Sequence, residues 1–174
     1  YITQIGGLTM AVATQGSYAY IGVGPRLVVL DISAPASPFM VGKTESFLIG
    51  STVQGIAVAG DYAYVADSVD LRVVDISNPA NPIEVGFYDA PGSANDVEVL
   101  GEYAYVAGGD TGVLVVDISD PANPVQTGFC DTPGFAHDVA VSGEYAYVAD
   151  GSAGVRVVDI SDPTNPNEVS AFDT

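Results

Sequence analysis

The sequence contains very few basic residues. Lysine and arginine number four (Arg26, Lys43, Arg72 and Arg156) against 22 aspartates and glutamates, which gives a formal net charge of −18. Proteins that bind nucleic acid place basic patches on phosphates and release counterions, and four scattered cations do not provide such a patch. The composition therefore excludes nucleic acid as a partner and disfavours anionic membranes. Cations, basic proteins, neutral glycans, other surface proteins and further copies of the chain are the partners left open.

Cysteine and long apolar runs are also scarce. The single cysteine, Cys130, permits neither a disulfide within the chain nor a zinc site built from cysteines. No apolar run approaches the roughly 18 residues that a membrane-spanning helix requires, so the sequence predicts no transmembrane segment. No signal peptide is visible, and residue 1 is Tyr1 rather than methionine. We therefore expect a processed product or a portion of a longer protein, which leaves secretion open.

What the sequence does contain is a repeated unit. Four Pro-rich stretches begin with Asp-Ile-Ser at Asp31, Asp75, Asp117 and Asp159, spaced 44, 42 and 42 residues apart. Each one follows a tyrosine pair, as in EYAYVAD, and an apolar run, as in VRVVDI. β-Branched and aromatic residues dominate four short segments per unit, and Gly, Pro, Asn and Asp separate these segments. Because sustained helical periodicity is absent, each unit predicts four β-strands.

The repeat predicts an all-β fold, a β-propeller built of four-stranded antiparallel blades of about 42 residues each. We expect one propeller domain or segment over residues 1–174, with four full repeats over about 8–50, 51–92, 93–134 and 135–174. In YAYVA, the tyrosines point to one face and the alanine and valine to the other, so large side chains are expected to meet small ones on the next blade.

The first residues stand outside this pattern of four units. Residues 1–7, YITQIGG, are similar to the fourth strand of a unit and lack the three strands before it. We therefore predict an orphan N-terminal strand that forms the outer strand of an adjacent blade.

The repeats resemble a known family. The runs LVVLDIS, LRVVDIS, VLVVDIS and VRVVDIS, each followed by a Pro-rich turn, resemble the LVIVD repeat, as does the preceding DVAVSGEYAYVAD. The likeness covers nearly the whole chain. It implies a propeller similar to bacterial and archaeal surface propellers, an extracellular or cell-surface location and a role in interaction. Because the motif serves packing, the resemblance implies no catalytic residues.

The number of units leaves open how the propeller closes, because propellers contain about four to eight blades and this chain has four units. The chain is expected to be a slice of a longer propeller or to assemble with copies of itself. Assembly would give eight blades from two chains, or a filament in which the orphan strand adds to a neighbouring sheet. We favour these arrangements over an isolated four-bladed ring. The predicted function is a non-catalytic extracellular or cell-surface structural or interaction module.

The repeated acidic residues have a structural interpretation. Asp and Ser side chains hydrogen-bond to nearby backbone and hold tight turns, and proline ends a strand, so the Asp-Ile-Ser stretches are interpreted as turns. The loop between the second and third strands carries Asp67, Asp70, Asp110 and Asp150. These are also interpreted as turn residues. Weak calcium binding is the alternative, although no loop has the D-x-D-x-D-G pattern, and no other cofactor is predicted.

A second candidate site precedes the first strand of each unit. Aligned units place Met10, Gln54, Asn95 and His137 at one position, and Ala11, Gly55, Asp96 and Asp138 at the next. The first strand of a propeller blade lines the central channel, and varied side chains on a repeated scaffold suit a site grafted onto a fold. A metal or a small polar ligand is therefore the candidate occupant of Gln54, Asn95, Asp96, His137 and Asp138. Hydrogen bonding at strand ends is the alternative.

Catalysis has little support in the sequence. There is one histidine, no G-x-S-x-G pattern and no phosphate-binding glycine loop. Cys130 aligns with Tyr88 of the second unit and is interpreted as a packing residue. Glycosidase chemistry requires a defined pair of carboxyl groups, and nothing marks one. We therefore predict that the chain is not an enzyme, with a hydrolase as the least favoured function.

Overall fold

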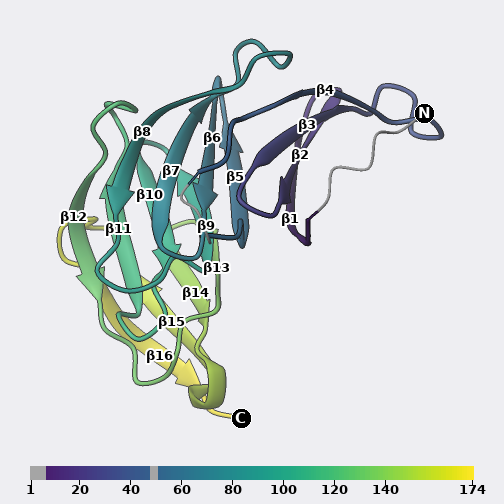
Figure 1. Cartoon of the computed structure of the whole chain (residues 1–174). Helices are drawn as coiled ribbons and strands as arrows, with labels where there is room; N and C mark the ends of the chain where they lie inside the picture. The colour runs from purple at the N-terminus through teal and green to yellow at the C-terminus, as the bar shows by residue number, and fades with distance from the viewer. Residues whose placement is uncertain (1–6, 48–50) are drawn as a thin grey trace.

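The computed structural model describes residues 7–47 and 51–174, in which the chain forms β-strands and one short 3-10 helix (Figure 1). In chain order the elements are β1 (Thr9–Gln15), β2 (Tyr18–Val23), β3 (Leu27–Asp31), β4 (Phe39–Lys43), β5 (Gly55–Ala59), β6 (Tyr62–Ala66), β7 (Asp70–Asp75), β8 (Ile83–Asp89), β9 (Asp96–Leu100), β10 (Tyr103–Ala107), β11 (Val113–Asp117), β12 (Val125–Cys130), β13 (Asp138–Ser142), β14 (Tyr145–Ala149), η1 (Gly151–Ala153), β15 (Val155–Asp159) and β16 (Asn167–Phe172). The predicted orphan strand over residues 1–7 lies outside the described residues, apart from Gly7.

The strands form four antiparallel sheets, each made of four consecutive strands. We call these sheets blade 1 (β1–β4), blade 2 (β5–β8), blade 3 (β9–β12) and blade 4 (β13–β16). The first two strands of a blade are joined by a tight turn, for which Gly101 and Gly143 adopt positive φ angles of 64° and 61°. The prediction of an all-β fold with four-stranded antiparallel blades is confirmed. None of the described residues forms a helix long and apolar enough to cross a membrane.

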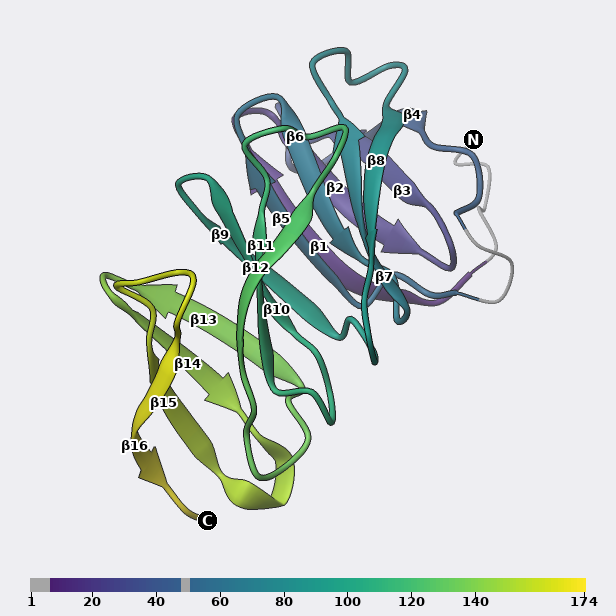
Figure 2. The same ribbon diagram turned by 90° about the vertical axis from the view of Figure 1, so that its left-hand side faces the viewer.

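The four blades stand in a row in chain order. Their first strands are neighbours, with β1 beside β5, β5 beside β9, and β9 beside β13. The outer strands spread apart, so that the row fans out from its inner edge (Figures 1 and 2). Blades 1 and 4 are the two ends of this row. Each of them therefore has one face that no other described blade covers.

The core consists of three apolar clusters, one at each junction between blades. At the junction of blades 2 and 3, Tyr64 packs with Ala104 and Val106. At the next junction, Tyr105 packs with Ala146 and Val148. The predicted packing of large on small side chains is therefore confirmed. We call the side of a blade that carries its tyrosines the tyrosine face, and the opposite side, which receives the preceding blade, the alanine face.

Candidate functional site

The Pro-rich turns are held by their first aspartates, as the sequence predicts. In each turn the Asp Oδ1 atom accepts a hydrogen bond from the backbone N–H of the serine two residues later. The four distances are 2.8 Å (Asp31 to Ser33), 2.8 Å (Asp75 to Ser77), 2.9 Å (Asp117 to Ser119) and 2.9 Å (Asp159 to Ser161). These hydrogen bonds lower the pKa of each aspartate because they stabilise its charged form. The aspartates therefore serve the turn.

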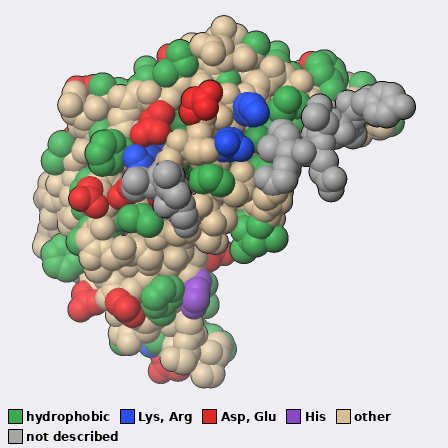
Figure 3. Space-filling model, in the orientation of Figure 1, with side chains coloured by type: hydrophobic (Ala, Val, Ile, Leu, Met, Phe, Trp, Pro, Cys, Tyr) green, Lys and Arg blue, Asp and Glu red, His purple; other side chains and the backbone are tan. Residues whose placement is uncertain are grey.

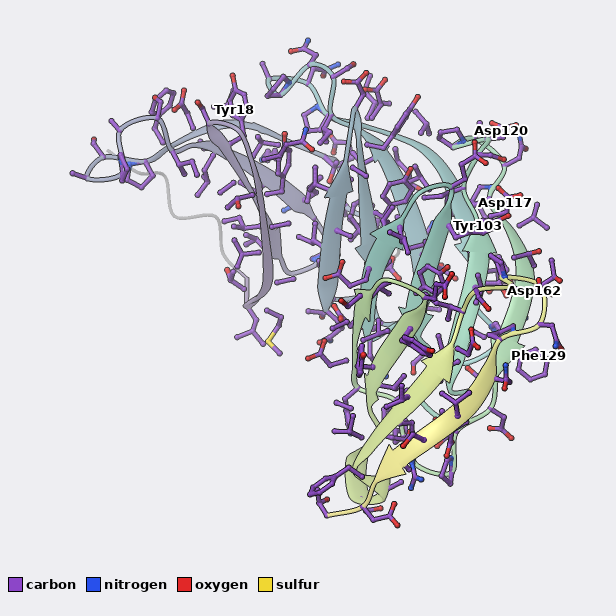
Figure 4. All side chains as sticks on the ribbon, turned by 180° about the vertical axis from the view of Figure 1, so that it is seen from behind. Tyr18, Tyr103, Asp117, Asp120, Phe129 and Asp162 are labelled. Atoms are coloured by element: carbon purple, nitrogen blue, oxygen red, sulfur yellow. The ribbon has the colours of Figure 1, made fainter. Side chains whose placement is uncertain are left out.

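The Pro-rich turns of blades 2, 3 and 4 also pack on the preceding blade. A Cβ atom added at Gly86 of β8 would lie 2.4 Å from the Pro121 carbonyl oxygen, and one at Gly128 of β12 would lie 2.3 Å from that of Pro163. The turns of blades 3 and 4 lie along one outer edge of the molecule, where Asp117, Asp120 and Asp162 are labelled (Figure 4). Glycine is required on the fourth strand because the next turn comes this close. Blade 4 carries Ser170 at this position.

A buried cluster of charges lies in blade 2. The Arg72 guanidinium is 3.1 Å from Asp67 Oδ2 and 3.2 Å from Glu84 Oε1, and it also pairs with Asp70. The Phe87 ring lies 4.8 Å from the guanidinium carbon. Burial raises the pKa of Asp70, and the Arg72 charge opposes this rise. Asp67 and Asp70 are therefore paired with an arginine of their own blade.

Blade 4 repeats this arrangement around Arg156. Its guanidinium nitrogens lie 3.7 Å from Asp150, 3.5 Å from Glu168 and 2.9 Å from Asp173. Asp150 is also fully buried and accepts hydrogen bonds from Thr132 Oγ1 at 2.7 Å and from the Gly134 N–H at 2.8 Å. The sequence interpretation missed these two arginines. The signal was present, because both occupy the variable position of V-x-VVDI in alternate units.

The loop aspartates considered for calcium binding thus divide into two kinds. Asp67, Asp70 and Asp150 are buried and have protein partners, whereas Asp110 is exposed. Among residues 7–47 and 51–174, no group of three or more metal-ligating side chains is placed to hold a metal ion. Their partners favour the interpretation that Asp67, Asp70 and Asp150 are structural.

Two of the candidate channel-entrance residues use their side-chain amides within the protein. Gln54 Nε2 donates to Ser68 Oγ at 3.0 Å, and Asn95 Nδ2 donates to the Ala136 carbonyl of the next blade at 2.8 Å. His137 is exposed, and its ring centroid lies 4.8 Å from that of Phe135. Asn95 therefore ties blade 3 to blade 4, and His137 presents an exposed ring that contacts Phe135.

The carboxyl groups of Asp96 and Asp138 are brought together across the junction of blades 3 and 4. Asp96 Oδ2 accepts a hydrogen bond from the Val139 N–H at 3.1 Å, and its carboxyl group hydrogen-bonds to that of Asp138. Burial, followed by this contact with Asp138, raises the pKa of Asp96 to about 7. A Cβ atom at Gly55 would lie 2.4 Å from Asp96 Oδ1, so the glycine makes room for the carboxylate. The Asp96 carboxyl group therefore binds its proton more tightly than an ordinary aspartate does.

The inner edge of the row contains a groove of about 460 Å3. Its lining comes from the first strands of blades 1 to 3 and consists of Val12, Ala13, Thr14, Ile56, Ala57, Val58, Glu98 and Val99. None of the five predicted channel-entrance residues belongs to this lining. On the face shown in Figure 3, acidic side chains are scattered and few basic ones lie among them.

One protein-family model matches all four blades of the chain. The LVIVD repeat matches the chain four times, over residues 6–45, 50–90, 91–132 and 133–174. The chain belongs to the LVIVD-repeat family. Each LVIVD match contains the four strands of one blade, so that the suspected family and the repeat number are both confirmed. No curated protein matches the chain.

The LVIVD repeats differ in how well their tyrosine faces are covered. The second tyrosine of the motif is 2% exposed at Tyr20, 4% at Tyr64 and 2% at Tyr105, each under the next blade. Its counterpart in blade 4, Tyr147, is 42% exposed. The face that three LVIVD repeats bury is therefore open in the fourth.

Proposed function

We propose that this LVIVD-repeat chain is a non-catalytic structural module that acts outside the cell or at its surface and associates with further copies of itself. The observation that carries the proposal is the open tyrosine face of blade 4. Its three counterparts form the apolar junctions of the molecule, so the same surface is built to bind another blade. The likeness to exported surface propellers supports the location.

The partners of the acidic side chains support a structural role. The turn aspartates bond to backbone, Asp67 and Asp70 pair with Arg72, and Asp150 is held by Thr132 and Gly134. Carboxyl groups used in this way hold the blades rather than a reacting molecule. The acidic surface keeps such a module soluble while its ends associate.

Sedimentation velocity of the 174-residue chain over a wide concentration range tests the association. We expect multiples of the single-chain mass that become more abundant as concentration rises. Labelling of intact cells that produce the complete natural protein, with an antibody against this region, tests the location. A chain that stays monomeric at every concentration would rule out self-association, and labelling only after cell lysis would rule out the surface role.

The second candidate function is binding of a metal or small polar ligand at the channel entrance, favoured by the paired carboxyl groups of Asp96 and Asp138. A divalent cation would compete with the proton that Asp96 binds. Calcium titration followed by thermal melting tests this function: a rise in melting temperature that Asp138→Asn removes and His137→Ala leaves is expected. An unchanged melting temperature at millimolar calcium would eliminate it.

A further inference from the structure

We propose that blade 3 contains a binding site for a guanidinium group, supplied by an arginine side chain of a partner protein or by a small guanidinium compound. The site is a pocket of about 320 Å3 on the side of blade 3 that faces blade 2. Blade 3 supplies its walls, apart from Pro91 in the segment that joins the two blades. None of the five predicted channel-entrance residues lines this pocket, and the site does not depend on self-association of the chain.

The pocket lies where blades 2 and 4 each hold the guanidinium of an arginine of their own. Leu114 of β11, which lines the pocket, occupies the position of Arg72 in β7 and of Arg156 in β15. Leu114 and Arg72 each lie opposite a phenylalanine of the fourth strand, Phe129 or Phe87. A leucine side chain ends near the point at which the guanidinium of an arginine begins. Leu114 therefore leaves the place of that group open.

Two groups that surround the arginines of the other blades are kept in this pocket. Phe129 occupies the position of Phe87, whose ring lies 4.8 Å from the guanidinium carbon of Arg72. Asp131 occupies the position of Asp173, whose Oδ1 atom accepts a hydrogen bond of 2.9 Å from the arginine of blade 4. The pocket thus offers a ring for stacking and a carboxylate for a charge-assisted hydrogen bond, which are the groups that hold a guanidinium.

The carboxyl groups of the pocket lie at its rim. Gly108 and Gly112 occupy the positions of the two buried aspartates that pair with Arg72 in blade 2. Asp110 and Asp131, which line the pocket, are both exposed. Both can therefore be reached by a ligand from solvent, whereas the aspartates of blade 2 are enclosed together with their arginine.

No basic residue of the described chain pairs with these two carboxyl groups. The ion pairs within residues 7–47 and 51–174 involve Arg72 of blade 2 and Arg156 of blade 4. The other basic residues, Arg26 and Lys43, belong to blade 1. A guanidinium from outside the chain would therefore meet no competing cation in the pocket, and the net charge of −18 would raise its concentration near the surface.

The chemistry of the pocket favours a guanidinium over an ammonium group. The Phe129 side chain is 57% exposed and lies on the outer side of the molecule (Figure 4). A planar guanidinium can stack on this ring and direct its N–H groups to Asp110 and Asp131 at the same time. An ammonium group is a compact, strongly hydrated charge that does not stack. Arginine is therefore the expected ligand side chain, and lysine the weaker one.

Titration of the isotope-labelled 174-residue chain with N-acetyl-L-arginine amide, followed by NMR, tests the site. We expect saturable shifts of the backbone amide signals of Thr111, Leu114 and Gln126. N-acetyl-L-citrulline amide has the same shape without the charge and should leave these signals in place, and N-acetyl-L-lysine amide should bind more weakly than the arginine compound. A peptide with one arginine between glycines distinguishes the two sources. Tighter binding of the peptide would favour an arginine of a partner protein, and equal binding a small guanidinium compound.

Variants of the pocket test the roles of its side chains. Asp131→Asn and Phe129→Ala are each expected to weaken binding of the arginine amide about threefold to fivefold, because they remove a carboxylate and the stacking ring. Leu114→Arg should abolish binding, since the guanidinium of the new side chain would fill the pocket. Glu102→Gln, on an exposed residue of blade 3 outside the pocket, is the matched control and should bind as the unmodified chain does. Thermal melting confirms that each variant is folded.

Three results would overturn the guanidinium site. An equal response to the arginine and citrulline amides would show that the charge is not recognised. Shifts spread over the acidic surface would indicate general attraction of cations, as would equal losses in Asp131→Asn and Glu102→Gln. Asp131→Asn and Phe129→Ala alter exposed side chains, so they decide the question even if Leu114→Arg does not fold. None of these results bears on self-association, which sedimentation measures separately.

Discussion

At the scale of single residues, one position of the repeat varies between the blades. It holds Ala11, Gly55, Asp96 and Asp138 in blades 1 to 4. The two aspartates meet because the junction of blades 3 and 4 places consecutive members of this position side by side. Gly55 leaves space that Asp96 fills. A carboxyl pair held in this way is a site where pH acts on the contact between two blades.

The stability of the chain is expected to fall between pH 4 and pH 8 through Asp96. Its pKa is raised from 3.8 to about 7 in the folded chain, so the folded state binds this proton more tightly than the unfolded state. The stabilising contribution is complete below about pH 4 and is lost as the pH rises through 7. Asp96→Asn keeps the acceptor for the Val139 N–H and removes the charge. We expect this variant to be more stable than the unmodified chain at pH 8, by about 1–2 kcal/mol after solvent screening.

Urea denaturation at pH 5 and pH 8 measures this effect. The exposed Asp110 provides the control, because Asp110→Asn changes net charge by the same amount without touching the pair. An equal gain in both variants at pH 8 would assign the effect to net charge and contradict a specific role for Asp96.

At the scale of elements, the Pro-rich turn and the fourth strand form a second contact between blades, outside the apolar core. Gly86→Ala is expected to destabilise the chain by about 2–3 kcal/mol, because its Cβ would lie 2.4 Å from the Pro121 carbonyl oxygen and would push blades 2 and 3 apart. Chemical denaturation gives the loss. Ser170→Ala is the control and should change stability little, since no further turn of the described chain covers blade 4 there. Comparable losses in the two variants would show that the turn contact is not the cause.

The buried charge clusters around Arg72 and Arg156 are a second stabilising feature at this scale. Leu114 occupies the position in blade 3 that Arg72 occupies in blade 2, so Arg72→Leu introduces a side chain that this position can hold. The variant leaves the buried carboxylates of Asp67 and Asp70 without their counter-charge. We expect a loss of about 3–5 kcal/mol in the free energy of unfolding.

Arg156→Leu gives the comparison within the same chain. We expect a smaller loss, because buried Asp150 keeps its hydrogen bonds from Thr132 and Gly134, and Asp173 is 81% exposed and can be solvated by water. Urea midpoints at pH 7 measure both variants. A smaller loss at Arg72 than at Arg156 would contradict the importance of burial.

At the scale of the whole molecule, the net charge of −18 opposes contact between copies. If apolar faces drive the association, added salt should strengthen it by screening this repulsion. Raising the NaCl concentration from 0.1 to 1 M shortens the screening length from about 10 Å to about 3 Å. We expect the dissociation constant measured by sedimentation to fall severalfold. An increase in the dissociation constant would indicate that opposite charges hold the copies together.

The sequence by itself determined the number of blades, their four strands and the turns between them. This was possible because these features depend on local patterns: alternation in YAYVA, doubly apolar third strands, and Asp-Ile-Ser followed by proline. The same local chemistry explains why the turn aspartates were correctly interpreted, since each one bonds to a serine only two residues away.

Only the tertiary structure decided which residues meet across blades. The pairing of Asp96 with Asp138, the contact of Arg72 in β7 with Glu84 in β8 and the close approach of Pro121 to Gly86 each join residues from separate strands or blades. Such contacts depend on how the sheets are placed in space, which no local pattern encodes. The open tyrosine face of blade 4 belongs to this class as well: Tyr64 and Tyr147 both lie in the segment YAYVAD, and their exposure differs because a blade follows one and not the other in the described chain.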